Sequence, residues 1–491
     1  MMALPAESPL HRIANPQHIA FFGASNNISA MGTGILRSIL AFGFPGAVYP
    51  IHPREKRVSG LTAYASVEAI PQVADLAYIV LPTRIVAETL EACGRKGIRQ
   101  AVIVSAGFNE VGGDGGLRQA QLQDIARRYG MRFTGPNCIG VFNAHARLNA
   151  TFIPFEGRPG VIGIASQSGS FLTQMFGYLD SQYGQGFSTG FSLGNEADLD
   201  LVDCLQYLGA CPDTRVIAIY VESIRRGRQF IETARAVAQH KPIVAYYAGG
   251  SEAGRRACLS HTGALAGPDR LYDGVLRQSG VIRARSICEM FDFCQVLGTA
   301  PLPRNQRAII QTHSGGPGAA AADACGRVGI DLPPLSAATL EKLTAYVPHT
   351  ASCGNPVDLT FSKNPLDYFH AIPAVLLQED GADSLLIYIL AYTQMVERGL
   401  AALGVEPSQI AAQTEAVIGE QCRNLASLVG TFNKPIVGFS FQTRNNPFVA
   451  GLQDRGIPVL GSPERAARAL GAMVRYRRLR EKIRRSDSSH Q

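Results

Sequence analysis

The feature that most limits the fold of this chain is a repeated alternation of short apolar segments with segments of helical spacing, punctuated by glycine and proline. The apolar segments of the first third include HIAFFGAS (18–25), LAYIVLP (76–82) and QAVIVSAGF (100–108). The segments between them, such as MGTGILRSILAFGF (31–44), place apolar residues three and four positions apart, which is the period of a helix. Because a strand, a crossover helix and a second strand form a β-α-β unit, this alternation predicts an α/β protein with a parallel, doubly wound sheet.

The alternation starts again twice further along the chain. GVIGIASQSGS (160–170) opens a second series, and RAIIQTHSGGPG (307–318) opens a third with the same order of strand, Ser/Gly turn and helix. A chain of 491 residues is also too long for one hydrophobic core. We therefore expect a Rossmann-like domain over 1–150, two related α/β domains over 151–302 and 303–474, and a basic tail over 475–491.

Composition narrows the classes of protein to which the chain can belong. No apolar run reaches the ~20 residues of a membrane span, and no basic-then-apolar leader precedes the first predicted strand. The ten cysteines are scattered, without a C-x-x-C pair or a cysteine–histidine cluster at metal-ligand spacing. We expect a cytoplasmic protein with reduced, mostly buried thiols, no membrane association and no metal site.

The net charge of +7 is concentrated at the C-terminal end of the sequence. The tail RYRRLREKIRRSDSSHQ (475–491) holds seven basic and two acidic residues, which leaves a charge of +2 for all other residues together. A basic tail can bind nucleic acid, but this one offers a single aromatic residue, Tyr476, among its charges. We interpret the tail as a solvated terminal helix and expect no nucleic-acid partner.

Turns rich in glycine and serine follow the first strand of each series. In GASNNISAMGTG, Gly23 permits a tight turn, and Gly32 lets a backbone approach phosphates at the start of a helix, where free N–H groups favour anions. The next strand is followed by Arg54 and Lys56, where the extra phosphate of a ribose would need a cation; a solvated basic loop is the alternative. The turns SQSGS and SGGPG are similar and favour phosphate chemistry as a function of the chain, although any α/β protein has some Gly/Ser turns.

We expect CLSHTGALAG (258–267) to form a loop, in which the histidine is either a turn residue or a reactive one. The imidazole of His261 is a good nucleophile towards phosphorus at neutral pH, because much of it is unprotonated. It would need a carboxylate to hold its other ring nitrogen. Glu222 follows the apolar segment VIAIYV, so we expect it at the carboxyl edge of the sheet, where such sites form. Further hydrogen bonds could come from Ser260, Thr262 and Gly263.

Nine stretches of the sequence resemble motifs of a known family. They occur in the order FFGAS, VSAGFNEVGG, GPNCIG, IASQSGS, GNEADLD, YVESI, SHTGALAG, SGGPG and NPVDL. The resemblance covers nearly the whole chain, about residues 19–472, and SHTGALAG together with GPNCIG is its most specific part. In these motifs the chain resembles the α subunit of the NDP-forming acyl-CoA synthetases of the acetate–CoA ligase type, relatives of succinyl-CoA synthetase.

The resemblance implies a CoA-binding Rossmann-like domain followed by two flavodoxin-like domains. It implies a transient phosphohistidine at His261 with Glu222 as its supporting carboxylate. Phosphate would be bound by Ser168 and Gly169 at a helix N-terminus, and by Ser260, Thr262 and Gly263. Coenzyme A would be bound by Gly23, Ala24, Ser25, Gly32, Arg54, Lys56, Ser105, Asn137 and Cys138.

The reaction that the resemblance implies is reversible: acyl-CoA, phosphate and ADP give a carboxylic acid, CoA and ATP. An acyl phosphate forms first, and the histidine then carries its phosphoryl group to the nucleotide. The sequence shows no ATP-grasp domain, which binds the nucleotide in this family. We therefore expect a separate ATP-grasp β subunit that binds ADP or ATP with Mg²⁺, in a heterodimer or a dimer of heterodimers.

Several positions depart from the family pattern. Relatives often have a lysine and an arginine before the histidine, where this chain has Tyr247 and Gly250, and asparagine is common where His313 and His52 stand. Two alternatives therefore remain: a CoA-binding regulatory or scaffold protein without turnover, and a relative that transfers an acyl or carbamoyl group without a nucleotide. We expect Cys138 to be a buried cysteine rather than a nucleophile.

Overall fold

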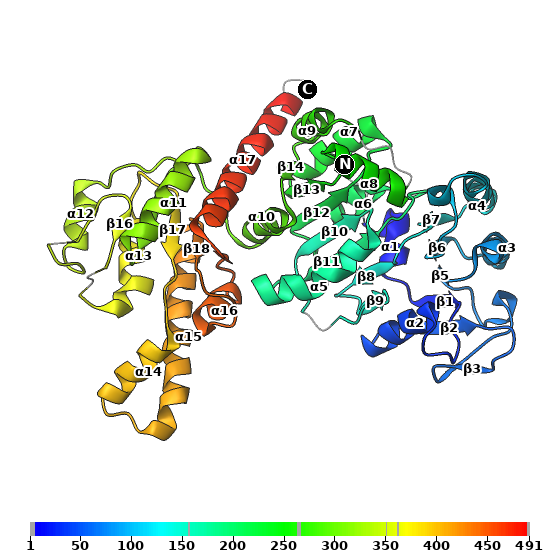
Figure 1. Cartoon of the computed structure of the whole chain (residues 1–491), viewed down its shortest axis with the longest axis horizontal. Coiled ribbons are helices and arrows are strands. Elements are labelled where there is room, and N and C mark those ends of the chain that lie inside the picture. The colour runs from blue at the N-terminus through cyan, green and yellow to red at the C-terminus, as the bar shows by residue number, and fades with distance from the viewer. Residues whose placement is uncertain (1–4, 156–157, 263–266, 350, 361–362, 489–491) are drawn as a thin grey trace. The chain divides into compact units, whose positions relative to one another are not determined.

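The structure of the chain, a computed structural model, describes residues 5–155, 158–262, 267–349, 351–360 and 363–488. The chain forms two compact units. Unit 1 comprises Met1–Asp180 and Gln185–Met290, and unit 2 comprises Ser181–Gly184 and Phe291–Gln491. Figure 1 labels most of the helices and strands of both units.

The first sheet of unit 1 has five parallel strands in the order β2-β1-β5-β6-β7. They are β1 (His18–Phe22), β2 (Ala47–Ile51), β5 (Leu76–Ile79), β6 (Gln100–Ile103) and β7 (Arg132–Thr134). A short antiparallel ribbon, β3 (Arg57–Val58) and β4 (Leu61–Thr62), follows β2. Every residue of β5 is buried, as is usual for a parallel strand covered on both faces.

Helices connect the strands of this first sheet. They are α2 (Met31–Ala41), α3 (Thr83–Lys96) and α4 (Gly115–Tyr129), and α1 (Pro9–Ala14) precedes β1. Glycines in the left-handed conformation end α3 and α4, at Gly97 and Gly130, because a residue without a Cβ adopts that conformation without strain. Two of the helices, α3 and α4, pack against each other, whereas α2 packs against β9 of the second sheet.

The second sheet of unit 1 has seven strands in the order β14-β13-β12-β10-β11-β8-β9 among the described residues. They are β8 (Val141–Asn143), β9 (Leu148–Ala150), β10 (Ile162–Ser166), β11 (Phe187–Ser192), β12 (Val216–Val221), β13 (Ile243–Tyr247) and β14 (Ile282–Ala284). The strands from β10 to β14 are parallel, and β8 and β9 are antiparallel. Residues 141–150 thus extend the second sheet, so the domain boundary expected at residue 150 follows strand β9.

The helices of the second sheet follow its strands in alternation. They are α5 (Gly169–Tyr183), α6 (Leu201–Ala210), α7 (Gly227–Ala238), α8 (Glu252–Thr262) and α9 (Asp269–Gln278), while α10 (Ile287–Thr299) runs from unit 1 into unit 2. Helix α6 begins with a capping box, in which Asp200 accepts from the backbone N–H of Val202 and Asp203 accepts from the backbone N–H of Asp200.

Unit 2 contains a five-stranded parallel sheet in the order β16-β15-β17-β18-β19. The strands are β15 (Ala308–Thr312), β16 (Val357–Asp358), β17 (Ser384–Tyr388), β18 (Ile436–Phe439) and β19 (Val459–Leu460). The helices are α11 (Gly315–Arg327), α12 (Ala337–Leu343), α13 (Ala371–Leu377), α14 (Thr393–Ala402), α15 (Pro407–Phe432), α16 (Pro447–Gln453) and α17 (Pro463–Ser488). Helix α14 and the adjoining end of α15 extend away from this sheet (Figure 1).

Short 3₁₀ helices also occur among the described residues, at Pro5–Glu7, Val67–Ala69, Asn109–Val111 and Pro365–Phe369.

The predicted α/β class with parallel sheets is confirmed. The basic tail is helical as expected, but α17 runs through the expected boundary at residue 474, and Tyr476 and Ile483 are buried, so the tail is not wholly solvated. No helix in the described part of the chain is long and apolar enough to cross a membrane.

Candidate functional site

The turn after β1 is held by close contacts that only glycine permits. Gly23 has a φ of +97°, and a Cβ there would lie 1.9 Å from the carbonyl oxygen of Val80. A Cβ at Gly32, in the first turn of α2, would lie 2.2 Å from the carbonyl oxygen of Gly23. Ala24 is buried between them. Both predicted glycines therefore bring the start of α2 against the end of β1.

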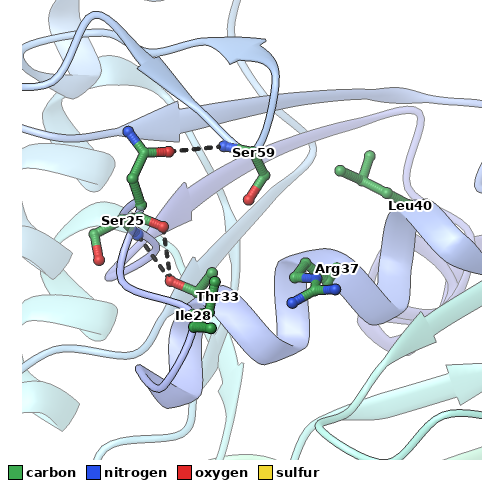
Figure 2. A pocket seen from close by; sticks show the side chains of 7 residues that line it. Ser25, Ile28, Thr33, Arg37, Leu40 and Ser59 are labelled. Carbon is green, nitrogen blue, oxygen red and sulfur yellow. Dashed lines mark hydrogen bonds between the residues drawn. The ribbon is translucent and has the colours of Figure 1, made fainter.

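A pocket of about 490 Å³ lies beside this turn (Figure 2). Its lining includes Ser25, Thr33, Arg37, Leu40 and Ser59. The Thr33 hydroxyl accepts from the backbone N–H of Ser25 at 3.0 Å and donates to the Ser25 carbonyl at 2.9 Å, which fixes the turn to α2. The pocket thus combines hydroxyl groups with one guanidinium group, a combination suited to anions.

The cation of this pocket is not one that the sequence analysis selected. Arg54 and Lys56 are exposed and are not part of the lining. They lie on a turn that His52 holds, since its Nδ1 accepts from the backbone N–H groups of Arg54 at 3.3 Å and Glu55 at 2.9 Å. Arg37 lines the pocket instead, and its only signal in the sequence is its position one helical turn after Thr33.

A second pocket, of about 440 Å³, lies where the carboxyl edge of the first sheet meets the start of α5. Ser105, Asn137 and Cys138 line it from the first sheet, and Gln167 and Gly169 line it from the second. Four residues predicted for CoA or phosphate binding therefore come together there. We call this pocket the chamber, and its described lining contains no charged side chain.

The polar groups of the chamber's first-sheet wall are bonded to the backbone. Ser105 Oγ donates to the Leu81 carbonyl at 2.6 Å and accepts from the Leu81 N–H at 3.0 Å. The Cys138 thiol donates to the Ile103 carbonyl at 3.3 Å. Burial raises the pKa of Cys138 to about 12, so its thiol is not ionised at neutral pH. Cys138 is therefore the buried cysteine that we expected.

The turn before α5, which we predicted to bind phosphate, is also closely packed. Ser168 precedes the helix, and its carbonyl accepts from Ser166 Oγ at 2.5 Å. Gly169 is the first residue of α5, and a Cβ there would lie 2.5 Å from Cγ1 of Ile139. The absence of a side chain at Gly169 thus lets the start of α5 approach the end of the first sheet.

Gln167 connects this turn to Glu222, although the sequence analysis did not select it. Its Oε1 accepts from the backbone N–H groups of Glu222 at 2.5 Å and Ser223 at 3.0 Å. Its Nε2 donates to the Ser223 carbonyl at 2.8 Å and to Glu196 Oε2 at 2.7 Å. Glu222 is buried and directly follows β12, at the carboxyl edge where we expected it.

Glu196 is a second residue that sequence reasoning missed. It is buried, has a φ of +49°, and also accepts from the backbone N–H of Leu201 at 3.1 Å. Burial, and next the charge of Asp200, raise the pKa of Glu196 to about 8, against the hydrogen bond from Gln167 and the charge of Arg225. Its only sequence signal was its place in the acidic run GNEADLD.

The position of His261 corrects one expectation. We expected it in a loop, but α8 extends to Thr262, so the backbone of residues 260–262 is helical. The physical reason is that Gly263 is the first glycine after Leu259, and glycine disfavours a helix more strongly than Ser, His or Thr does. The side chains of Ser260, His261 and Thr262, and the whole of Gly263, lie outside the described part of the structure.

The pKa of Cys258 indicates which charged residue lies near the C-terminal end of helix α8. Burial, and next the negative charge of Glu222, raise the pKa of the Cys258 thiol. The helix that carries His261 therefore passes within electrostatic range of Glu222.

The two departures before the histidine are accommodated by packing. The Tyr247 hydroxyl donates to the Gly267 carbonyl at 2.7 Å, and its ring stacks on Tyr272 with centroids 3.8 Å apart. Tyr272 in turn accepts from the backbone N–H of Ile224 at 3.2 Å. A Cβ at Gly250 would lie 2.5 Å from Oδ1 of Asp269. Tyr247 thus ties the segment after the histidine to the loop after Glu222.

Within the described residues, no group of three or more His, Cys, Asp or Glu side chains could hold a metal ion.

Comparison with known families matches residues 17–144 to a CoA binding domain and residues 159–297 to a succinyl-CoA ligase like flavodoxin domain. The first match carries the turn after β1 and the first-sheet wall of the chamber. The second carries the start of α5, Glu222 and His261.

Curated relatives and a solved structure resemble most of the chain. It is 42% identical to acetate–CoA ligase [ADP-forming] II subunit alpha of Pyrococcus furiosus, over 76% of this chain and 80% of that protein. It is 35% identical to acetate–CoA ligase [ADP-forming] I of Archaeoglobus fulgidus, over 97% of this chain but only 65% of that protein. The structure of dinucleotide forming acetyl-coenzyme A synthetase 1 of Ca. Korarchaeum cryptofilum, in complex with phosphate and ADP, matches with a TM-score of 0.85 and 34% identity over 97% of this chain and 98% of that one. On this similarity, the chain belongs to the family of ADP-forming acetate–CoA ligase α subunits, with succinyl-CoA ligase-like CoA-binding domains.

Proposed function

We propose that this chain is the CoA-binding and transiently phosphorylated α subunit of an ADP-forming acyl-CoA ligase. It interconverts acyl-CoA, phosphate and ADP with a carboxylic acid, CoA and ATP. The observation that carries this proposal is the chamber, where Ser105, Asn137 and Cys138 from one sheet meet Gln167 and Gly169 from the other. A thioester bound from the first sheet would there meet phosphate bound at the start of α5.

The two pockets fit the two ends of CoA. The pocket beside the β1 turn has the hydroxyls of Ser25 and Ser59 and the guanidinium of Arg37, which suit the phosphates of the nucleotide end. The chamber has no charged side chain among its described lining residues, which suits the uncharged thiol end and its acyl group.

The first chemical step takes place at the turn before α5. A phosphate oxygen attacks the thioester carbonyl, the carbon–sulfur bond breaks, and an acyl phosphate and the CoA thiolate result. Backbone N–H groups at the start of α5, preceded by Ser168 and beginning with Gly169, hold the phosphate oxygens. The absence of a side chain at Gly169 keeps that helix end close to the first sheet.

In the second step His261 attacks the phosphorus of the acyl phosphate and releases the carboxylate. Glu222 holds the other ring nitrogen and balances the positive charge that develops on the imidazole. Two observations support this pairing. Gln167 binds the backbone N–H of Glu222, and the Glu222 charge acts on Cys258, three residues before His261 on α8.

The phosphoryl group then passes from His261 to ADP on a second polypeptide. We propose an ATP-grasp β subunit, with Mg²⁺ bound beside its nucleotide, in a heterodimer or a dimer of heterodimers. The relative from Pyrococcus furiosus is itself named as a subunit alpha, which supports a partner chain.

Intact-protein mass tests the proposal. The purified chain is incubated with inorganic phosphate, Mg²⁺ and a panel of acyl-CoAs, alongside His261→Ala, Glu222→Gln and a matched control, His240→Ala. His240 is an exposed histidine two residues after the end of α7. We expect one acid-labile phosphate on the wild type and on His240→Ala, and none on His261→Ala. We expect Glu222→Gln to react at least about tenfold more slowly, since one hydrogen bond to a charged group is worth about 1.5–3 kcal/mol.

A different result would favour the regulatory alternative. If the wild type binds CoA but takes up no phosphate, even with an ATP-grasp partner and ATP, the chain is a CoA-binding protein without turnover. The observation that favours this alternative is Tyr247, which stands in a stretch where the family pattern often has a basic residue and which instead donates to the Gly267 carbonyl.

A further inference from the structure

We infer that Arg37 binds a phosphate group of CoA and so anchors its nucleotide end, an inference that rests on the proposed function. The residue lies on α2, four positions after Thr33, and its side chain is exposed. It lines the 490 Å³ pocket together with Ser25 and Ser59 (Figure 2). The guanidinium group of Arg37 and the hydroxyl groups of Ser25 and Ser59 therefore line the same pocket.

The charge of Arg37 is available for a ligand. Among the described residues, no carboxylate forms an ion pair with it. Arg57 of the nearby ribbon differs, because its guanidinium donates to the Gly60 carbonyl at 2.7 Å. A planar guanidinium can donate two parallel hydrogen bonds to one phosphate, which makes arginine a preferred ligand for that group.

Shared lining residues connect Arg37 to the chamber. A third pocket, of about 460 Å³, lies along α2 and is lined by Arg37, Ser38, Asn149 and Phe152 among others. Arg37 also lines the 490 Å³ pocket, and Phe152 also lines the chamber. The three pockets therefore form a series around α2. A ligand with a reactive thiol at one end and phosphates at the other matches this series, with its thiol in the chamber and a phosphate at Arg37.

Calorimetric titration tests the assignment with two ligands and three proteins. CoA and dephospho-CoA are titrated into the wild type, Arg37→Gln and Arg95→Gln. Arg95 is a matched control, because it is also an exposed arginine on a helix of the same sheet, the last turn of α3. We expect Arg37→Gln to weaken CoA binding about ten- to a hundredfold, the effect of one hydrogen bond to a charged group. We expect Arg95→Gln to change it less than about twofold.

Dephospho-CoA distinguishes the two kinds of phosphate. If Arg37→Gln weakens CoA but not dephospho-CoA, Arg37 binds the 3′-phosphate; if it weakens both equally, Arg37 binds the diphosphate. Equal CoA affinity of Arg37→Gln and the wild type would overturn the inference and leave the proposed function intact. A wild type that binds neither ligand would overturn both. Because Arg37 is exposed, the substitution should leave the melting temperature within about 1 °C, which a thermal melt checks.

Discussion

The turn before α5 in unit 1 and the turn before α11 in unit 2 share a hydrogen bond from a strand-end hydroxyl to a backbone carbonyl, but the residue between the two bonded residues differs. In each, the last strand residue donates its hydroxyl to the carbonyl of the residue before the helix: Ser166 to Ser168 at 2.5 Å, and Thr312 to Ser314 at 2.8 Å. The residue between them is Gln167 in unit 1 and His313 in unit 2.

These two middle residues have different surroundings. Gln167 accepts from the backbone N–H of Glu222 and donates to the carboxyl of Glu196, so it ties the turn to residues that follow the two strands beside β10. His313 stacks on Tyr368 with ring centroids 3.4 Å apart, and its Nε2 has no hydrogen-bond partner among the described residues. Two Ser/Gly turns with the same hydrogen bond can therefore differ in surroundings, because the residues of neighbouring strands determine what the middle side chain contacts.

The largest expected effect is the difference in stability between a substitution of Gln167 and the same substitution of His313. Gln167→Leu leaves two backbone N–H groups, of Glu222 and Ser223, without their acceptor, which should cost about 2–4 kcal/mol of unfolding free energy. It should also reduce phosphorylation at least about tenfold. His313→Leu at the matching position should cost about 1 kcal/mol or less and leave phosphorylation unchanged. Urea denaturation and intact mass measure both, and equal effects of the two substitutions would remove the distinction between the turns.

The next effect concerns the pH dependence of unit 1. The pKa of Glu196 is raised to about 8, so between about pH 4.5 and pH 8 the folded state holds a proton that the unfolded state releases. Its contribution to stability is therefore full below about pH 4.5 and is lost as the pH rises towards 8. Glu196→Gln should become more stable relative to the wild type by about 1–3 kcal/mol over that range. Thermal melts at pH 5 and pH 8 measure the change, and a constant difference would show that Glu196 is ionised throughout.

His313 should give a pH dependence of the opposite sign. Burial lowers the pKa of His313 to about 4, against the charge of Asp358, so between about pH 6.5 and pH 4 only the unfolded state takes up the proton. The contribution of His313 to the free energy of unfolding is therefore fully present above about pH 6.5 and is lost as the pH falls towards 4. His313→Asn should reduce the loss of stability on acidification by about 1–2 kcal/mol. Melts of the two proteins at pH 7 and pH 4.5 provide the measurement; parallel curves would contradict the buried, neutral histidine.

The smallest effect compares the first residues of the two helices. A Cβ at Gly169 would lie 2.5 Å from Ile139, whereas a Cβ at Gly315 would lie at an ordinary 3.4 Å from Asp358. Gly169→Ala should therefore cost about 1–2 kcal/mol, and Gly315→Ala should be neutral within about 0.5 kcal/mol. Differential scanning calorimetry compares them. A destabilising Gly315→Ala would indicate that the start of α11 is as closely packed as the start of α5.

Much of the architecture could be predicted from local sequence patterns. Apolar segments such as LAYIVLP and VIAIYV became buried strands of parallel sheets, because their period and their glycine and proline limits are local properties. The glycines at 23, 32 and 169 were also visible, since close approach of backbone requires the residue without a side chain. The sequence indicated His261 as a candidate reactive residue. Its helical backbone was not predicted, because the glycines after it suggested a loop.

The order of strands, turns and helices, and the motifs that indicate the family, can be read from local sequence patterns. Which side chains meet at the turns follows from the tertiary fold alone. Gln167 meets Glu222 across 55 positions and Glu196 across 29, and Arg37 lines a pocket with Ser59 from another part of the chain. The physical reason is that a periodic pattern records which face of an element is buried, whereas a hydrogen bond or a shared pocket depends on strand order and register, which bring distant residues together.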